Sequence, residues 1–227
     1  MRKSLIAVAI GTALTVAACS DKDAAQQVSQ AGQVEQTQMT QASQFDQSNP
    51  FYAPSTLPYQ APDFTKIKFE HFEPAFEAGM AEHAAEIEAI ANNPEAPTFE
   101  NTIVEMERAG ELLGRVSSVF SNIAGSAGND DTRALQGKLA PKFAAHRDNI
   151  MLNPKLFERV KAVYENRDAL SGEALRLVED TYKGFVRAGA ELSEDAKQRI
   201  REINTEMSSL TTEIQRNLMT LARENMV

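Results

Sequence analysis

The stretch EDAKQRIREINTEMSSLTTEIQRNLMTL, residues 194–221, determines the fold class, because its apolar side chains repeat at helical spacing. These side chains are Ile200, Ile203, Met207, Leu210, Ile214, Leu218 and Leu221. Steps of three and four residues place them on one face of a helix of about seven turns. Ser193, followed by two acids, predicts the start of this helix, because a serine cap and negative charge both stabilise a helix N-terminus. A face this long needs a partner, so either it packs back on the preceding helices or the chain is the front part of something longer.

The same periodicity recurs in shorter segments between residues 69 and 123. One helix is expected to begin near residues 69–74, where Pro74 is tolerated in the first turn. Thr98 is expected to cap a second helix that keeps the helical period as far as Ile123. The expected inward positions of these two helices are Phe72, Phe76, Met80, His83, Ile87, Ile90, Ile103, Met106, Leu112, Leu113, Val116, Val119, Phe120 and Ile123.

Three further helices are expected before the last one. The first begins near Asp131 and contains Pro141, which should kink it unless the helix ends there. The others begin at Asn153-Pro154 and at Ser171. No stretch alternates with a period of two, so strands are not expected. The sequence therefore predicts an all-α domain over residues 51–227.

The N-terminus resembles a lipoprotein signal. Arg2 and Lys3 precede an apolar run over residues 5–18, which is too short to span a bilayer comfortably. The run ends in Val-Ala-Ala before Cys19, the single cysteine of the chain, although leucine is more usual than valine at the first of these positions. We therefore expect residues 1–18 to be a lipoprotein signal peptide and Cys19 to be acylated. An ordinary secretory signal that happens to contain a cysteine is the alternative.

Residues 19–50 are expected to form the acylated cysteine and a flexible linker. They are rich in Gln, Ala and Ser and contain few apolar side chains, so they cannot bury enough surface to offset the entropy of ordering. Acyl chains on Cys19 would anchor the domain to a membrane. The expected location is the bacterial cell envelope, with the domain in the periplasm. Ser20 after the cysteine favours the outer membrane.

Composition excludes several classes of protein. With 23 Lys+Arg against 32 Asp+Glu, the formal net charge is -9, which argues against a nucleic-acid partner. One cysteine excludes an internal disulfide framework and a cysteine-rich zinc module.

Catalytic motifs are not recognisable in the sequence. A His-Glu-x-x-His zinc site needs two imidazoles one helical turn apart, and His71, His83 and His146 do not have that spacing. We interpret His83 as a histidine at the edge of the core or as a capping histidine. Carboxylates such as Glu82, Glu86, Glu88, Glu105, Glu107 and Glu111 have the spacing of a solvated helix face. From the residues alone we assign no catalytic residue, no metal ligand and no cofactor to this chain.

Several blocks of sequence, in order, resemble the start of a peptidyl-dipeptidase of the thimet oligopeptidase family. They are NPF at residues 49–51, LPYQAPDF at 57–64, IKFEHFEPAFEAGM at 67–80, IANNPEAPTFENTI at 90–103, LAPK at 139–142, HRDNI at 146–150, NPKLFERV at 153–160 and LRLVEDTY at 175–182. The resemblance implies a zinc metallopeptidase that is mostly helical and two-lobed, and that releases C-terminal dipeptides from oligopeptides. The zinc-binding residues of that family follow later in the sequence than the part matched here.

The resemblance leads to two hypotheses. In the first, the chain is the N-terminal helical region of a membrane-anchored peptidyl-dipeptidase, truncated before its catalytic lobe and inactive alone, and it meets oligopeptide substrates only together with that lobe. Zinc would then belong to the complete family member. In the second, the chain is a stand-alone, lipid-anchored helical module that binds peptides or a partner protein.

Overall fold

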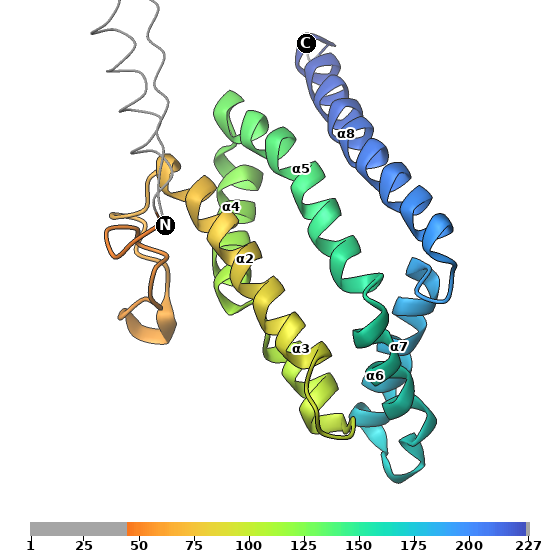
Figure 1. The fold of residues 1–227 in the computed structure, drawn as a ribbon. Coiled ribbons are helices and arrows are strands. Elements are labelled where there is room, and N and C mark those ends of the chain that lie inside the picture. Colours follow the sequence, from red (N-terminus) through yellow and green to blue (C-terminus); the bar gives the residue numbers. More distant parts are fainter. Residues whose placement is uncertain (1–44, 226–227) are drawn as a thin grey trace, which may run out of the picture. The chain divides into compact units, whose positions relative to one another are not determined.

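The structure, a computed structural model, describes residues 45–225, and these residues are helical with no strand among them (Figure 1). The all-α prediction is confirmed. The α-helices are α2 (Phe72–Ala91), α3 (Glu105–Arg108), α4 (Glu111–Ala127), α5 (Asp130–Met151), α6 (Pro154–Glu165), α7 (Gly172–Ala188) and α8 (Glu194–Asn225). Short turns of 3-10 or π-helix occupy Pro58–Gln60, Phe69–His71, Phe99–Val104 and Arg167–Ala169. Within this part of the chain no helix is both long and apolar enough to cross a membrane.

Helix α2 connects two hydrophobic clusters. Near its start, Phe72 and Phe76 pack with α4 and α5, and the Phe76 and Phe120 rings meet edge to face with centroids 5.4 Å apart. Near its end, Ile87 and Ile90 pack with α6 and α7. Because one continuous helix contributes to both clusters, the position of α4 and α5 is coupled through α2 to that of α6 and α7. The expected inward face of this helix is confirmed at these four positions.

The segment between α2 and α3 is held by a cap and by a buried arginine. Thr98 caps the following turn as expected, and its Oγ1 accepts from the Asn101 N–H at 3.0 Å. Arg159 of α6 is buried, and its guanidinium donates to the carbonyls of Asn93 and Glu95 at 2.8 and 3.0 Å. The same group donates to the side chains of Asn101 and Thr102. This loop is therefore fixed to α6 by four hydrogen bonds from one side chain.

The prediction of a single helix from Thr98 to Ile123 is wrong. The structure has a π-helical turn, the short α3 and then α4, with a break at Ala109 and Gly110. Ala109 is extended, and Gly110 has φ 80° and ψ 26°, in the left-handed region that glycine enters without steric cost. Apolar spacing continued across the break, which is why periodicity alone did not reveal it.

Helix α5 continues through Pro141 without ending there. Proline lacks an N–H, so the carbonyl of Gly137 loses its usual helical donor at this point. At the start of the helix Asn129 provides the cap, and its Oδ1 accepts from the Thr132 N–H at 3.0 Å. The start predicted near Asp131 is confirmed to within one residue.

Helix α8 packs along α5, beside which it runs in Figure 1. The contact involves small polar side chains. Asn204 donates to Asp148 Oδ1 at 2.8 Å, and Thr212 faces Gly137. The partly buried positions Asn204, Ser208 and Thr212 recur every four residues. Helix α8 therefore meets the rest of the domain with a polar stripe.

Before α2, residues 45–71 pack on the start of the bundle. The side chain of Asn49 is buried and donates from Nδ2 to the His71 carbonyl at 3.0 Å. Phe51 is buried, and the centroid of its ring lies 5.3 Å from the ring centroid of Phe72. Asn49 belongs to the range 19–50 assigned to the linker. The signal peptide, Cys19 and most of that linker lie outside the described residues.

Candidate functional site

The three histidines have different surroundings. His83 lies on α2 and His146 on α5, and the Nδ1 of His83 is 3.0 Å from the Nε2 of His146. The ring centroids are 5.0 Å apart, with 57° between the ring planes. His71 does not join this pair, because its Nδ1 accepts the N–H of Lys68 at 3.0 Å. Two of the three histidines therefore meet, although 63 residues separate them in sequence.

Burial lowers the pKa of both paired rings, which favours their neutral forms. The pKa of His83 is lowered by burial, an effect that the nearby Glu86 carboxylate opposes. The pKa of His146 is lowered by burial and by the proximity of His83. One ring must donate and the other accept in the contact between them, so a neutral pair fits the geometry.

Sequence reasoning missed this pair. His83 was interpreted as a core-edge histidine, which agrees with its half-buried position. No short-range motif could have revealed its partner, because α5 supplies His146 from a distant part of the sequence. The available signal was weak. Each histidine continues the helical spacing of apolar residues on a predicted helix, since His83 lies three residues after Met80 and His146 three residues after Phe143.

The acidic side chains form no paired catalytic arrangement among the candidates named from sequence. Glu82, Glu88, Glu105, Glu107 and Glu111 are exposed, as expected for a solvated face. Glu86 differs, because it is partly buried and accepts the Gly110 N–H at 2.7 Å. Its carboxylate thereby fixes the α3–α4 break beside His83, a structural role. Among residues 45–225, no three side chains of His, Cys, Asp or Glu are grouped so that they could hold a metal ion.

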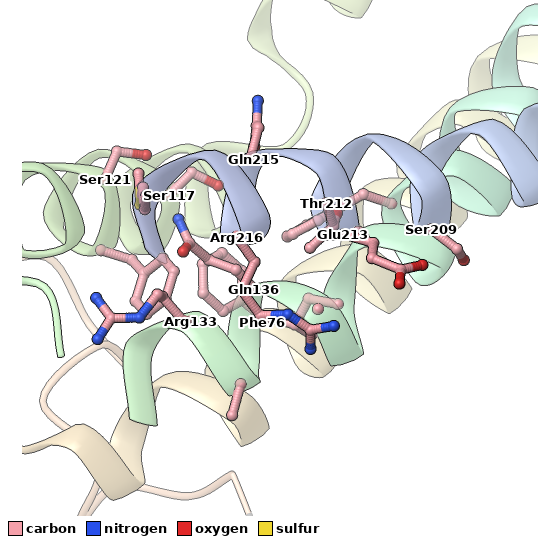
Figure 2. Close-up of a pocket in the computed structure, with 17 residues that line it drawn as sticks. Phe76, Ser117, Ser121, Arg133, Gln136, Ser209, Thr212, Glu213, Gln215 and Arg216 are labelled. Atoms are coloured by element: carbon pink, nitrogen blue, oxygen red, sulfur yellow. The ribbon is translucent and has the colours of Figure 1, made fainter. Parts of the chain in front are cut away.

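A cavity of about 700 Å³ lies between α4, α5 and α8 (Figure 2). Phe76, Phe120 and Leu139 provide apolar walls, while Arg133 of α5 and Arg216 of α8 bring positive charge to the polar part. Glu213 is the one carboxylate among its lining residues. The hydroxyl, amide and guanidinium groups of this cavity can form hydrogen bonds with a polar group, and its aromatic walls can contact an apolar one. Its lining residues provide one carboxylate and no histidine, so they do not form an acid and base pair for hydrolysis.

The apolar face of α8 is exposed. Met207, Ile214 and Leu218 are 58%, 58% and 60% exposed, and Ile203, Leu210 and Leu221 are exposed on the same face. Met219 is also exposed, but it lines the cavity between α4, α5 and α8. The sequence left open whether this face packs back on the preceding helices. Ile200 at its start is partly buried beside Gly189, but from Ile203 onward the face does not pack back, because the polar stripe of α8 makes that contact instead. A row of large apolar side chains this long is typical of a surface that another protein segment covers.

Comparison with known proteins places this chain beside bacterial peptidases. Dipeptidyl carboxypeptidase of Escherichia coli is 43% identical over 173 residues, which are 75% of this chain and 25% of that protein. The Salmonella typhimurium protein of the same name is 41% identical over 178 residues, or 78% of this chain and 26% of that protein. Oligopeptidase A of Escherichia coli is 23% identical over 171 residues, again 25% of its length. No family model matches the chain. The chain thus spans about a quarter of the length of the curated relatives it matches.

Proposed function

Because the chain belongs to the thimet oligopeptidase family of peptidases, we propose that it forms the N-terminal helical region of a peptidyl-dipeptidase. In this proposal the complete enzyme releases C-terminal dipeptides from oligopeptides. The identity of 43% and 41% to two proteins named dipeptidyl carboxypeptidase favours this branch over oligopeptidase A, at 23%.

The exposed apolar face of α8 is the observation that carries the proposal. Burying large aliphatic side chains stabilises a protein by roughly 25 cal/mol per Å² of apolar surface, so leaving six of them exposed on one face of α8 forgoes several kcal/mol. The matched relatives are about four times as long as the aligned region. We propose that this face packs against the part of the enzyme that corresponds to the unmatched three quarters.

The described residues do not fit the zinc site that the family resemblance implies. That site requires two histidines one helical turn apart and a third ligand, whereas His83 and His146 are brought together from separate helices and His71 is hydrogen-bonded elsewhere. We therefore propose that this chain contributes no zinc ligand to peptide hydrolysis. In this proposal the chain forms part of the wall of the substrate channel and limits which peptides can enter. The chain alone is inactive.

The decisive experiment is to read the nucleotide sequence beyond the codon for Val227. An in-frame or shifted His-Glu-x-x-His downstream supports the proposal, and co-production of that downstream part with this chain should yield a soluble complex with dipeptide-releasing activity. A stop codon followed by an unrelated gene favours the alternative of a stand-alone helical module. The chain alone should release no dipeptide from a blocked tetrapeptide in the presence of added zinc, and measurable release would contradict the assignment.

We also propose that the chain is a lipoprotein anchored through Cys19, with the helical domain in the periplasm at the outer membrane. Removal of residues 1–18 takes out Arg2 and Lys3 and no acid, so the mature chain has 21 Lys+Arg against 32 Asp+Glu, and this net charge of -11 would hold the domain away from an anionic membrane surface. Labelling cells with a radioactive fatty acid should mark the wild-type protein. The Cys19→Ala variant should be unlabelled and should move to the soluble fraction. Equal labelling of both would contradict the anchor.

A further inference from the structure

The contact between His83 and His146 has the geometry of a chelating pair. Two imidazole nitrogens bound to one Zn²⁺ at 2.0–2.1 Å with tetrahedral angles lie about 3.3 Å apart. The observed separation of 3.0 Å between Nδ1 of His83 and Nε2 of His146 differs from this by only a few tenths of an ångström. Once the donating ring has moved its proton to its other nitrogen, small rotations of the two rings would direct both lone pairs to a common point.

The two helices hold the pair in place. Residue numbers rise together along α2 and α5, so the helices run parallel and their contacts form a ladder. Ion pairs join Glu73 to Lys138 and Glu77 to Lys142, and the rings of Phe76 and Phe143 meet edge to face. His83 with His146 is the next step of this ladder. Ligands held on packed helices lose little freedom when a metal binds, which favours chelation.

The surroundings of the two histidines suit a divalent cation that prefers imidazole nitrogen as a ligand. Both rings are half-buried, so water can reach the remaining coordination positions. In the metal-free pair one of the two facing nitrogens carries the shared proton, and moving that proton to the other nitrogen of the same ring leaves both facing lone pairs free for a metal ion. Glu86 places a negative charge near His83, and its carboxylate is fixed by the Gly110 N–H. Imidazole nitrogen prefers Zn²⁺, Ni²⁺ or Cu²⁺ over Mg²⁺ or Ca²⁺.

We propose that His83 and His146 together bind one Zn²⁺ or Cu²⁺ ion, which bridges α2 and α5 and takes its other ligands from water. This site is separate from the zinc site that the family resemblance implies, and it does not depend on the proposed peptidase role. With two protein ligands it binds more weakly than a structural zinc site with four.

Electron paramagnetic resonance of the wild-type chain with one equivalent of Cu²⁺ tests the proposal without any mutation. Nitrogen couplings from two imidazoles are expected, and a spectrum with oxygen ligands alone would overturn it. Calorimetric titration with Zn²⁺ should show one site, and His83→Asn and His146→Asn should each weaken binding at least tenfold. His71→Asn is the matched control and should bind as wild type does. Loss of binding in the control, or unchanged binding in folded His83 and His146 variants, would overturn the assignment.

Discussion

Arg159 donates from Nη2 to Oδ1 of Asn101 at 2.9 Å, and this bond connects α6 to the loop that precedes α3. Asn101 also shares in the cap of that turn, since its Oδ1 accepts the Thr98 N–H at 2.8 Å. Among the residues that the structure describes, no carboxylate lies within ion-pairing distance of the guanidinium, and its acceptors are neutral. Burial lowers the pKa of Arg159, an effect that the charge of Glu95 opposes. The arginine is thus a buried hydrogen-bond centre for the loop.

Replacing Arg159 with methionine should destabilise the fold by about 3 kcal/mol. The substitution keeps much of the side-chain volume but removes the donor to the carbonyls of Asn93 and Glu95 and to the buried Thr102 hydroxyl, whereas Asn101 Oδ1 keeps the Thr98 N–H. Hydrogen bonds from a charged donor and unmet buried acceptors are each worth about 1–3 kcal/mol. Urea denaturation followed by circular dichroism measures the change. Arg108→Met is the control, because Arg108 is exposed and pairs with Glu105 at the surface. It should change the free energy of unfolding by less than about 1 kcal/mol, and equal losses in both variants would contradict this role.

The sequence predicted one half of this arrangement. Thr98 after a proline is a recognisable helix cap, because the signal lies within a few residues. Arg159 was not singled out, since its acceptors lie at least 57 residues away and only the packing of α6 brings them together. Local chemistry was readable in the sequence, while the partner supplied by tertiary structure was not.

Gly110→Ala should destabilise the protein, whereas Gly114→Ala should stabilise it. Gly110 has φ 80°, and a Cβ there would lie 3.0 Å from Cγ of His83. The left-handed conformation alone costs alanine roughly 1–2 kcal/mol. Gly114 lies inside α4, where an added Cβ meets nothing within 4 Å, so alanine should gain about 0.5–1 kcal/mol. Thermal unfolding midpoints of the two variants should move in opposite directions, and a shift in the same direction would contradict the assigned conformations.

Gly110 also shows why the helix boundary was misplaced. Apolar positions Met106 and Leu112 kept a helical period across the break, and an isolated glycine inside such a pattern is tolerated in many helices. The left-handed turn depends on Glu86, whose carboxylate accepts the Gly110 N–H from another helix. Sequence periodicity contains no information on that contact.

Acidification should weaken the fold through His83 and His146. Their pKa values are lowered in the folded protein, mainly by burial, and the unfolded value is about 6.5. Above that pH both states are neutral and the pair contributes fully to stability. As pH falls below 6.5 the unfolded chain binds protons that the folded protein does not, so the free energy of unfolding decreases.

Urea denaturation at several pH values between 7.5 and 5.5, with a chelator present, measures how the free energy of unfolding depends on pH. The charged group that acts on the pair from α2 is Glu86, which opposes the effect at His83. A double variant with glutamine at both histidine positions should lose most of the slope over this range, because most carboxylates titrate at lower pH. If the double variant keeps the wild-type dependence of unfolding free energy on pH, other groups cause that dependence and the prediction is wrong.

The apolar face of α8 should make the isolated chain associate with itself. Ile214 and Leu218 are 58% and 60% exposed, and their side chains gain from any apolar contact. Replacing both with glutamine should shift the protein toward monomer in light scattering after gel filtration. The midpoint of thermal unfolding of the dilute protein should hardly change, since neither residue belongs to the two hydrophobic clusters. Thr205→Gln, at an exposed position on another side of the helix, should associate as wild type does. A wild-type chain that is monomeric at high concentration would show that this face needs no cover, and would remove the main support for its docking against the rest of a peptidase.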